Sequence, residues 1–362
     1  MTRTSAALVS ALAVACASPT PPGDRDRART GTATRSGTGS RSGSESGSGS
    51  ESRSGSESGS GSESGSGSES GSGSESGSRS AAQPCDGSPR TLGAGLTHER
   101  WPIDAVPRIP VEACLDLVRV DLAHHALRLV TASRDGAARP APRWVDDLGL
   151  VAAVNAGMFH AGGRSVGLLV DGDHVDQGRD NPKLGGYLAF GPRDPAAAPV
   201  ALTGRGCRDF DLAALRAAYR TVVQSYRLLG CDGQALPWAD AKHYSAAGVG
   251  LDRDGRVVLL HARAPFLMRE LSAALARPAL GLRGALFVEG GPEATVAVHG
   301  ASGRLLRVGS YETGFVEDDD NHAPWALPNL IAVRALAAPA GAPAPTSTPV
   351  APAGGGSPPG AR

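Results

Sequence analysis

Two carboxylates beside a pair of glycines are the residues best suited to chemistry. Glu289 ends the apolar run 285–288, precedes Gly290 and Gly291, and is followed by Glu293 four residues later. A carboxylate at the mouth of a buried strand is partly desolvated, which shifts its pKa. Carboxylate pairs are the acids, bases and nucleophiles of glycoside hydrolysis. We therefore predict Glu289 and Glu293 as catalytic residues; a loop or helix-start position is the alternative for Glu293.

A second apolar run ends in an amide that could bind a ligand. Asn155 follows the run 151–154 and precedes Gly157. The amide both donates and accepts hydrogen bonds, which suits sugar hydroxyl groups. The alternative is that the amide satisfies the backbone of its own turn, as Asn beside Gly often does. Glycines at both strand ends allow close backbone approach, so the two ends could converge on one cleft.

Lysine is rare in this chain. Of the 36 basic residues only Lys183 and Lys242 are lysines, and both lie in dense polar segments. Because a compact ammonium and a guanidinium are not interchangeable, either lysine could hold a phosphate as a point charge. Chance retention is the alternative.

Several other functions lack a sequence signal. The net charge is zero, which argues against a nucleic-acid partner. The acidic run 317–320 lacks the spaced oxygens of a calcium loop, and no cysteine pair has zinc-site spacing, so we predict no metal and no cofactor. The nucleophile-elbow, phosphate-loop and zinc-protease motifs are also missing from the sequence.

The elements that must position these residues are mostly strands. Period-two patterns predict strands over 114–122, 126–130, 167–170, 187–190, 222–229, 284–288, 295–298 and 327–333, and a hairpin over 246–261 around the turn 252–255. Helical spacing appears at 210–219 and 265–275. Strands and helices do not alternate regularly. We predict an α+β fold with a mixed, largely antiparallel sheet and a few packed helices, flanked by disordered tails.

The chain divides into four predicted parts. Residues 1–16 resemble a lipoprotein signal peptide that ends at Cys16, residues 17–84 are a Gly/Ser/Glu-rich disordered linker, 85–337 form the folded domain, and 338–362 are an Ala/Pro-rich disordered tail. This organisation predicts an exported bacterial protein tethered to the membrane by a lipid on Cys16. The alternative is an ordinary signal peptide cut near Ala17 and a secreted protein.

Cysteine number fits an oxidising compartment. With Cys16 set aside, Cys85, Cys114, Cys207 and Cys231 remain, and three pairings are possible. We favour the sequence-near pairs Cys85–Cys114 and Cys207–Cys231. Buried free thiols are the alternative.

Taken together, the motifs resemble the phosphodiester glycosidase family. The resemblance rests on the order and spacing of six segments: 155–159, 166–172, 224–229, 245–255, 285–293 and 328–333. Two positions depart from the family pattern: Glu289 stands where Asp is common, and Tyr244 where Arg is frequent.

The resemblance implies hydrolysis of a glycosyl–phosphate linkage at the sugar carbon. Glu289 would be base or nucleophile with Glu293 as its partner, and Lys183 and Lys242 would hold phosphate. Asn155, Ser245 and Gln224 would bind the substrate. Two other functions remain as alternatives. One is a non-catalytic surface lipoprotein that binds glycans, which the unusual residues Glu289 and Tyr244 favour, and the other is a protein-interaction module on a stalk.

Overall fold

The computed structural model describes residues 83–239 and 241–337. The predicted signal segment with Cys16, nearly all of the predicted linker and the tail 338–362 lie outside the described residues and stay predictions. Within the described ranges, no helix is both long and apolar enough to cross a membrane.

The larger of two main sheets has eleven strands in the order β1-β2-β3-β13-β12-β14-β11-β7-β8, and β9 pairs with β11 and carries β10. These strands are β1 (Arg90–Gly93), β2 (Leu96–Pro102), β3 (Cys114–Val120), β7 (Leu169–Asp171), β8 (His174–Gln177), β9 (Gly186–Pro192), β10 (Val200–Gly204), β11 (Tyr219–Arg227), β12 (His243–Asp252), β13 (Val257–Leu267) and β14 (Leu282–Gly290).

The second sheet has five strands in the order β16-β15-β6-β18-β4, and a two-stranded ribbon joins β17 to β5. Their bounds are β4 (His125–Thr131), β5 (Arg139–Pro140), β6 (Ala152–Asn155), β15 (Thr295–Gly300), β16 (Gly303–Val308), β17 (Ala326–Leu327) and β18 (Asn329–Ala335). All the pairings between the described strands are antiparallel.

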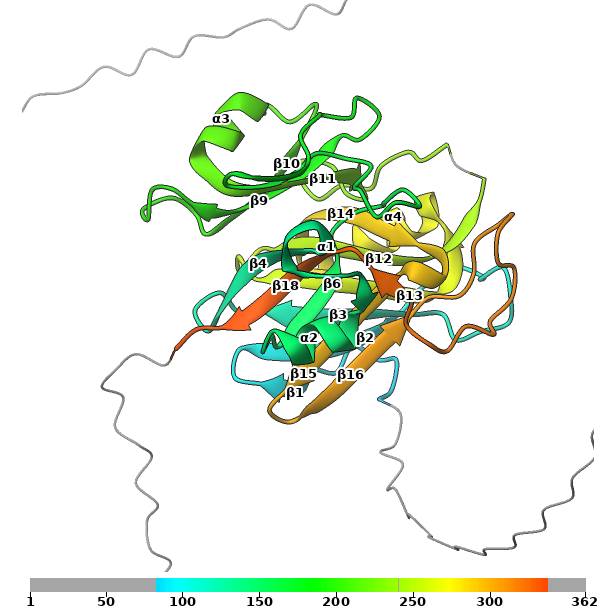
Figure 1. Cartoon of the computed structure of the whole chain (residues 1–362). Coiled ribbons are helices and arrows are strands. Elements are labelled where there is room, and N and C mark those ends of the chain that lie inside the picture. The colour runs from blue at the N-terminus through cyan, green and yellow to red at the C-terminus, as the bar shows by residue number, and fades with distance from the viewer. Residues whose placement is uncertain (1–82, 240, 338–362) are drawn as a thin grey trace, which may run out of the picture. The chain divides into compact units, whose positions relative to one another are not determined.

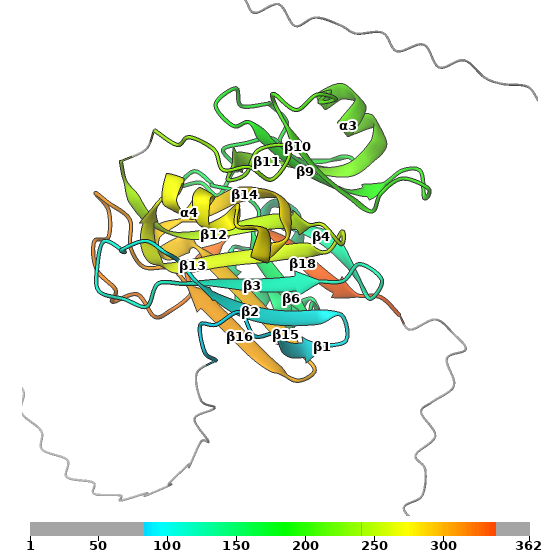
Figure 2. The ribbon, with the colours of Figure 1, turned by 180° about the vertical axis from the view of Figure 1, so that it is seen from behind.

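The two sheets face each other across one apolar core (Figures 1 and 2). Leu129, Val154 and Ile331 of the five-stranded sheet belong to the same buried cluster as Val249 and Val288 of the larger sheet. Strand β14 is buried along almost its whole length because it is covered on both sides. This explains why its sequence reads as a continuous apolar run instead of alternating.

Four short α-helices cover the sheets: α1 (Ala132–Asp135), α2 (Ala141–Asp147), α3 (Leu212–Ala218) and α4 (Met268–Leu275). On α4, Met268, Leu271 and Leu275 share one face at helical spacing and pack with Phe266 and Phe287 on the larger sheet. The α3 helix starts at Asp211, whose carboxylate accepts hydrogen bonds from two backbone N–H groups of its first turn.

The predicted fold class is confirmed: the chain forms mostly antiparallel sheets with a few helices. The hairpin β12–β13 and the helices α3 and α4 fall where the patterns placed them. One connection differs: β3 and β4 do not pair with each other but lie in different sheets. The segment before β6 also forms the helix α2. Its residues Trp144 and Val145 are buried and pack against the five-stranded sheet.

Two disulfides join the sequence-near pairs. Cys85 bonds Cys114 at the start of β3, and Cys207 bonds Cys231. Closing loops of 29 and 24 residues restricts the unfolded chain and stabilises the fold by about 3–4 kcal/mol each in the chain-entropy model. Disulfides persist in oxidising compartments, so they indicate an extracytoplasmic protein.

Candidate active site

A cavity of about 420 Å³ opens where β14 ends beside the start of β12. It is lined by four aromatic side chains, two methionines, two carboxylates and a glycine: Met158, Tyr226, Trp238, Tyr244, Met268, Phe287, Glu289, Gly290 and Glu312. An apolar cavity with a few convergent polar groups is the usual form of a small-molecule site.

Glu289 is the buried acid of this cavity. It is the penultimate residue of β14, and it is 8% exposed. Oε1 accepts a weak hydrogen bond from the Gly290 N–H at 3.2 Å, and Oε2 has no hydrogen-bond partner among the described residues. Burial, and then the negative charges of Glu293 and Glu312, raise the pKa of Glu289 well above its usual value.

A β-bulge shapes the strand at this acid. In the β12–β14 pairing Ala247 lies opposite Glu289, whereas Gly248 lies opposite Phe287, so Val288 is the extra residue. Phe287 and Glu289 both face the cavity while Val288 lies in the core between the sheets. Bulges re-aim side chains and are frequent next to functional sites.

Two carboxylates, those of Glu293 and Glu312, lie beside Gly291. This glycine has a φ of +64°, and a Cβ placed on it would lie 2.8 Å from Glu312 Oε2 and 3.5 Å from Glu293 Oε2. Any other residue would be strained there and would push the Glu312 carboxylate away. Glu293 is half-buried, and burial together with the charge of Glu312 raises its pKa as well. The glycine turn therefore brings acids from two distant segments together.

The cavity wall is a run of aromatic rings in contact with one another. The ring of Trp238 lies 5.5 Å from that of Tyr226 and 6.5 Å from that of Phe287, and Tyr244 lies 6.3 Å from Phe287. A Cβ on Gly290 would meet Phe287 and Tyr244 at 3.1 and 3.2 Å, so the glycine leaves these rings their room. Such rings present flat apolar faces beside polar edges.

The two strand ends that could converge lie close together, although Asn155 does not itself line the cavity. Asn155 ends β6, and its Nδ2 donates to the Glu293 carbonyl at 3.0 Å while its Oδ1 accepts from the Thr295 N–H at 2.8 Å. Met158, three residues later, lines the cavity. The Asn155 amide thus ties the five-stranded sheet to the turn that carries Glu293.

Gln224 is the centre of a buried hydrogen-bond hub on β11. Its Oε1 accepts from the backbone N–H groups of Leu168 and Asn181, both at 2.9 Å. Its Nε2 lies within hydrogen-bond distance of acceptors that include the Asp180 carboxylate and the Leu184 carbonyl. The amide therefore anchors the segment that carries Lys183, which is exposed and does not line the cavity.

Ser245 and Lys242 lie at the start of β12. Ser245 is fully buried; its Oγ donates to the Arg263 carbonyl at 2.6 Å and accepts from the N–H groups of Ser310 and Tyr311 at 3.1 Å each. It thereby fixes the chain just before Glu312. Lys242 is exposed, two residues from the cavity residue Tyr244.

Several residues of the cavity were not predicted from the sequence. Glu312 sits in an irregular loop with no periodic pattern, and only the fold brings it to Gly291. Phe287 could have been found, because a strand places residues two apart on one face and Glu289 was already singled out. Tyr226 likewise lies in a segment that carries the family resemblance, two residues after Gln224 on β11.

Potential metal ligands cluster elsewhere. In the described ranges, the one group of three such side chains close enough to share an ion is Cys85, Glu112 and Cys114. Its two sulfurs are joined in a disulfide and are not thiolates, so the group does not fit a metal ion.

The fold and the site thus define a class of protein: a β-rich domain with an acidic cavity, walled by aromatic rings, at the ends of its strands. A family model described as phosphodiester glycosidase matches residues 148–334. The match spans more than half of the chain, and the chain belongs to the phosphodiester glycosidase family.

Two solved structures are similar in outline. The catalytic domain of zebrafish N-acetylglucosamine-1-phosphodiester alpha-N-acetylglucosaminidase, auto-inhibited by its pro-peptide, is 14% identical with a TM-score of 0.49, over 68% of this chain and 85% of that one. A hypothetical protein from Synechocystis is 13% identical with a TM-score of 0.44, over 66% of this chain and 62% of that one. No curated protein matches the chain significantly.

Proposed function

We propose that this protein hydrolyses a glycosyl–phosphodiester in the cavity at the end of β14. One observation carries the proposal: a buried carboxyl group, Glu289, faces an aromatic-walled cavity with one oxygen unpartnered among the described residues and with two further carboxylates nearby. A strongly perturbed acid in a cavity is a catalytic candidate on physical grounds. Family membership supports the reaction class.

The raised pKa favours Glu289 as the acid instead of the base or nucleophile expected from the sequence. A phosphodiester is an anion, and an ionised Glu289 would repel it. A protonated Glu289 is neutral and donates a hydrogen bond to the phosphate oxygen. As the bond from the sugar carbon to that oxygen breaks, the same proton can pass to the departing phosphate and neutralise its charge.

Glu293 and Glu312 are the candidates for the second role. One of them, ionised, accepts the proton of the attacking water or attacks the sugar carbon itself, and it stabilises the positive charge that develops there. The aromatic wall of Tyr226, Trp238, Tyr244 and Phe287 would pack against the sugar ring. Lys242 lies two residues before the wall residue Tyr244, so it is the better candidate of the two lysines to bind the phosphate. Lys183 would contact only a part of the substrate that extends out of the cavity.

Three predicted substrate-binding residues are assigned a supporting role. Asn155, Ser245 and Gln224 direct their polar atoms at protein groups, so we propose that they position the cavity's loops. Their contribution to substrate binding is then indirect, through Glu293, Glu312 and the segment with Lys183.

The test is turnover of a chromogenic glycosyl phosphodiester by Glu289→Gln. Losing a general acid slows the reaction about 10²–10⁴-fold. Asp209→Asn, which removes an exposed carboxylate that does not line the cavity, is the control and should keep full activity. Undiminished turnover by Glu289→Gln would sink the assignment.

Glycan binding without catalysis is the second candidate function. The continuous aromatic wall favours it, since such a surface binds a sugar ring whether or not the acids react. Saturable binding of the same phosphodiester by calorimetry, with no turnover by the wild-type protein at any pH, would select this function.

We infer an exported protein held at the membrane through Cys16, with secretion as the alternative. The two disulfides support export. A Cys16→Ser variant expressed in a bacterial host should move from the membrane fraction to the soluble fraction. An unchanged distribution would rule out the lipid anchor.

A further inference from the structure

A second polar groove, of about 390 Å³, lies between the two sheets and away from the proposed active site. It is lined by residues of β4, α1, β7, β9, β11 and β18: Leu127, Arg128, Leu129, Arg134, Asp171, Phe190, Gly191, Arg220, Thr221 and Arg334. Four of these ten residues are arginines, although the whole chain has no net charge.

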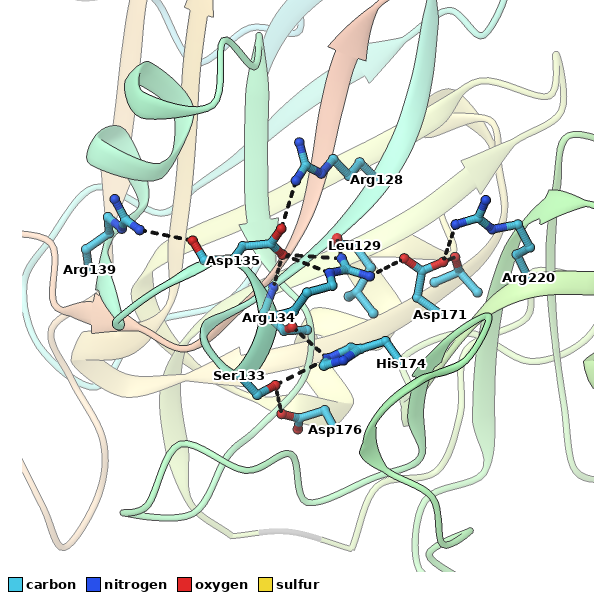
Figure 3. Close-up of polar contacts among 12 residues, drawn as sticks. Arg128, Leu129, Ser133, Arg134, Asp135, Arg139, Asp171, His174, Asp176 and Arg220 are labelled. Atoms are coloured by element: carbon cyan, nitrogen blue, oxygen red, sulfur yellow. Dashed lines mark hydrogen bonds and ion pairs between the residues drawn. The ribbon is translucent and has the colours of Figure 1, made fainter.

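Two of the arginines are held in place by aspartates (Figure 3). Arg134 lies between Asp135 and Asp171, with its Nη1 2.6 Å from Asp171 Oδ2, and Arg128 Nη2 lies 2.8 Å from Asp135 Oδ1. Burial opposes ionisation of both aspartates, but hydrogen bonds and the nearby arginines outweigh it and lower both pKa values. The network therefore stays charged and ties α1 to β7.

The other two arginines keep donors to spare. The side chain of Arg220 is 62% exposed, and its single ion pair within the described part of the chain, with Asp171, is long at 3.4 Å. Arg334 is exposed, and its side chain makes no hydrogen bond or ion pair with the described residues. Four arginines thus face two aspartates, which leaves an excess of two positive charges in a recess.

We propose that this groove binds a phosphate group, either free or as part of a phosphodiester-linked chain. The planar guanidinium matches phosphate oxygens with two parallel N–H donors, and two exposed arginines on facing strands can clamp one group. The two aspartates hold Arg128 and Arg134 in a rigid network without net charge, so the excess positive charge of the groove belongs to the other two arginines. Arg220 and Arg334, from β11 and β18, supply the direct contacts.

The groove is distinct from the aromatic cavity. Thr221 lines the groove and Tyr226 the cavity, and five residues of extended strand place them roughly 17 Å apart along β11. The phosphate site does not depend on the reaction proposed for Glu289. It would hold a second phosphate of a repeating chain, or a free phosphate ion.

The experiment is calorimetric titration of the full chain with inorganic phosphate and, separately, with a short poly(glycerol phosphate), at low ionic strength. The groove variant is Arg220→Ala with Arg334→Ala. The matched control is Arg143→Ala with Arg208→Ala, which removes two exposed arginines that do not line the groove. Melting temperatures of both variants check the fold.

We expect the groove variant to bind both probes at least about tenfold more weakly, because it loses charge-assisted hydrogen bonds to the phosphate. The control should bind like wild type. Tighter binding of the polymer than of phosphate would identify a phosphodiester chain as the ligand, and equal binding per phosphate the free ion. Equal weakening in both variants, or no saturable binding by wild type, overturns the proposal. Turnover of a small chromogenic substrate should be unchanged in the groove variant, so its outcome tests Glu289 separately.

Discussion

Replacing Glu289 by Gln should stabilise the fold at neutral pH while removing the reactive acid. In the folded chain the carboxyl group is buried, receives one weak hydrogen bond and faces Glu293 and Glu312, so its pKa is raised well above 4.5. The unfolded chain has no such environment. Ionisation of Glu289 therefore favours unfolding, and glutamine, which has the same shape and no charge, escapes this cost.

The magnitude follows from proton linkage. Below about pH 4.5 both states hold the proton, and ionisation of the carboxyl group makes no difference to the stability. Above that pH the unfolded state releases the proton first, so stability falls by about 1.4 kcal/mol per pH unit until the pH passes the folded-state pKa. The advantage of the Gln variant should grow by the same amount. For a domain of this size it corresponds to roughly 3–6 °C in melting temperature per pH unit.

Thermal unfolding of wild type, Glu289→Gln and the control Asp209→Asn from pH 4 to pH 8 measures this effect. His261, whose pKa burial lowers to about 4, makes stability rise with pH between about 4 and 6.5. It does so equally in all three proteins and cancels in the differences. A constant gap between wild type and Glu289→Gln across the range would refute the buried, uncompensated carboxyl group.

Three further predictions concern the same cavity. Glu312→Gln removes a negative neighbour, so the basic limb of the kcat/KM profile assigned to Glu289 should move to lower pH; an unmoved limb contradicts the electrostatic coupling. Trp238→Ala removes the centre of the aromatic wall and should raise KM about five- to tenfold with little change in kcat, measured by steady-state kinetics. Gly291→Ala should cost about 1–2 kcal/mol for its left-handed backbone plus the contact with Glu312, as measured by urea unfolding. Gly149→Ala, with a similar positive φ and open space around it, should cost the backbone part alone, and equal losses would exclude the contact.

The strands could be predicted from the sequence because their signals are local. Alternating or continuous apolar runs bounded by turn residues predicted β7, β12, β14 and β18 close to their observed bounds, whereas β13 continues six residues beyond its predicted end. The partner of each strand was harder to predict. Strands β3 and β4 follow one another, yet each pairs in a different sheet, because sheet membership depends on which apolar faces meet in the core.

Some residues of the candidate site could also be predicted from local sequence, and others could not. Glu289 and the glycines beside it could be singled out because a charge at the end of a buried run contradicts its surroundings. Glu312 could not, since its neighbours in sequence show no pattern and its place at Gly291 follows from the loop that Ser245 fixes. Nor could the arginine groove, because its residues come from elements far apart in sequence and the chain's total charge is zero.

The buried polar residues of the sequence motifs and the buried acid of the cavity differ in whether their hydrogen-bonding groups are satisfied. Asn155, Gln224 and Ser245 are each almost fully buried, and each joins backbone groups of separate segments. Buried amides and hydroxyls stabilise only when their partners are in place, so such residues select one arrangement of the loops over others. Glu289 is the opposite case, since its buried oxygen has no partner among the described residues. The fold thus satisfies the polar atoms of Asn155, Gln224 and Ser245 but holds the Glu289 carboxyl group at a cost in stability, which agrees with the proton-donor role that we propose for it.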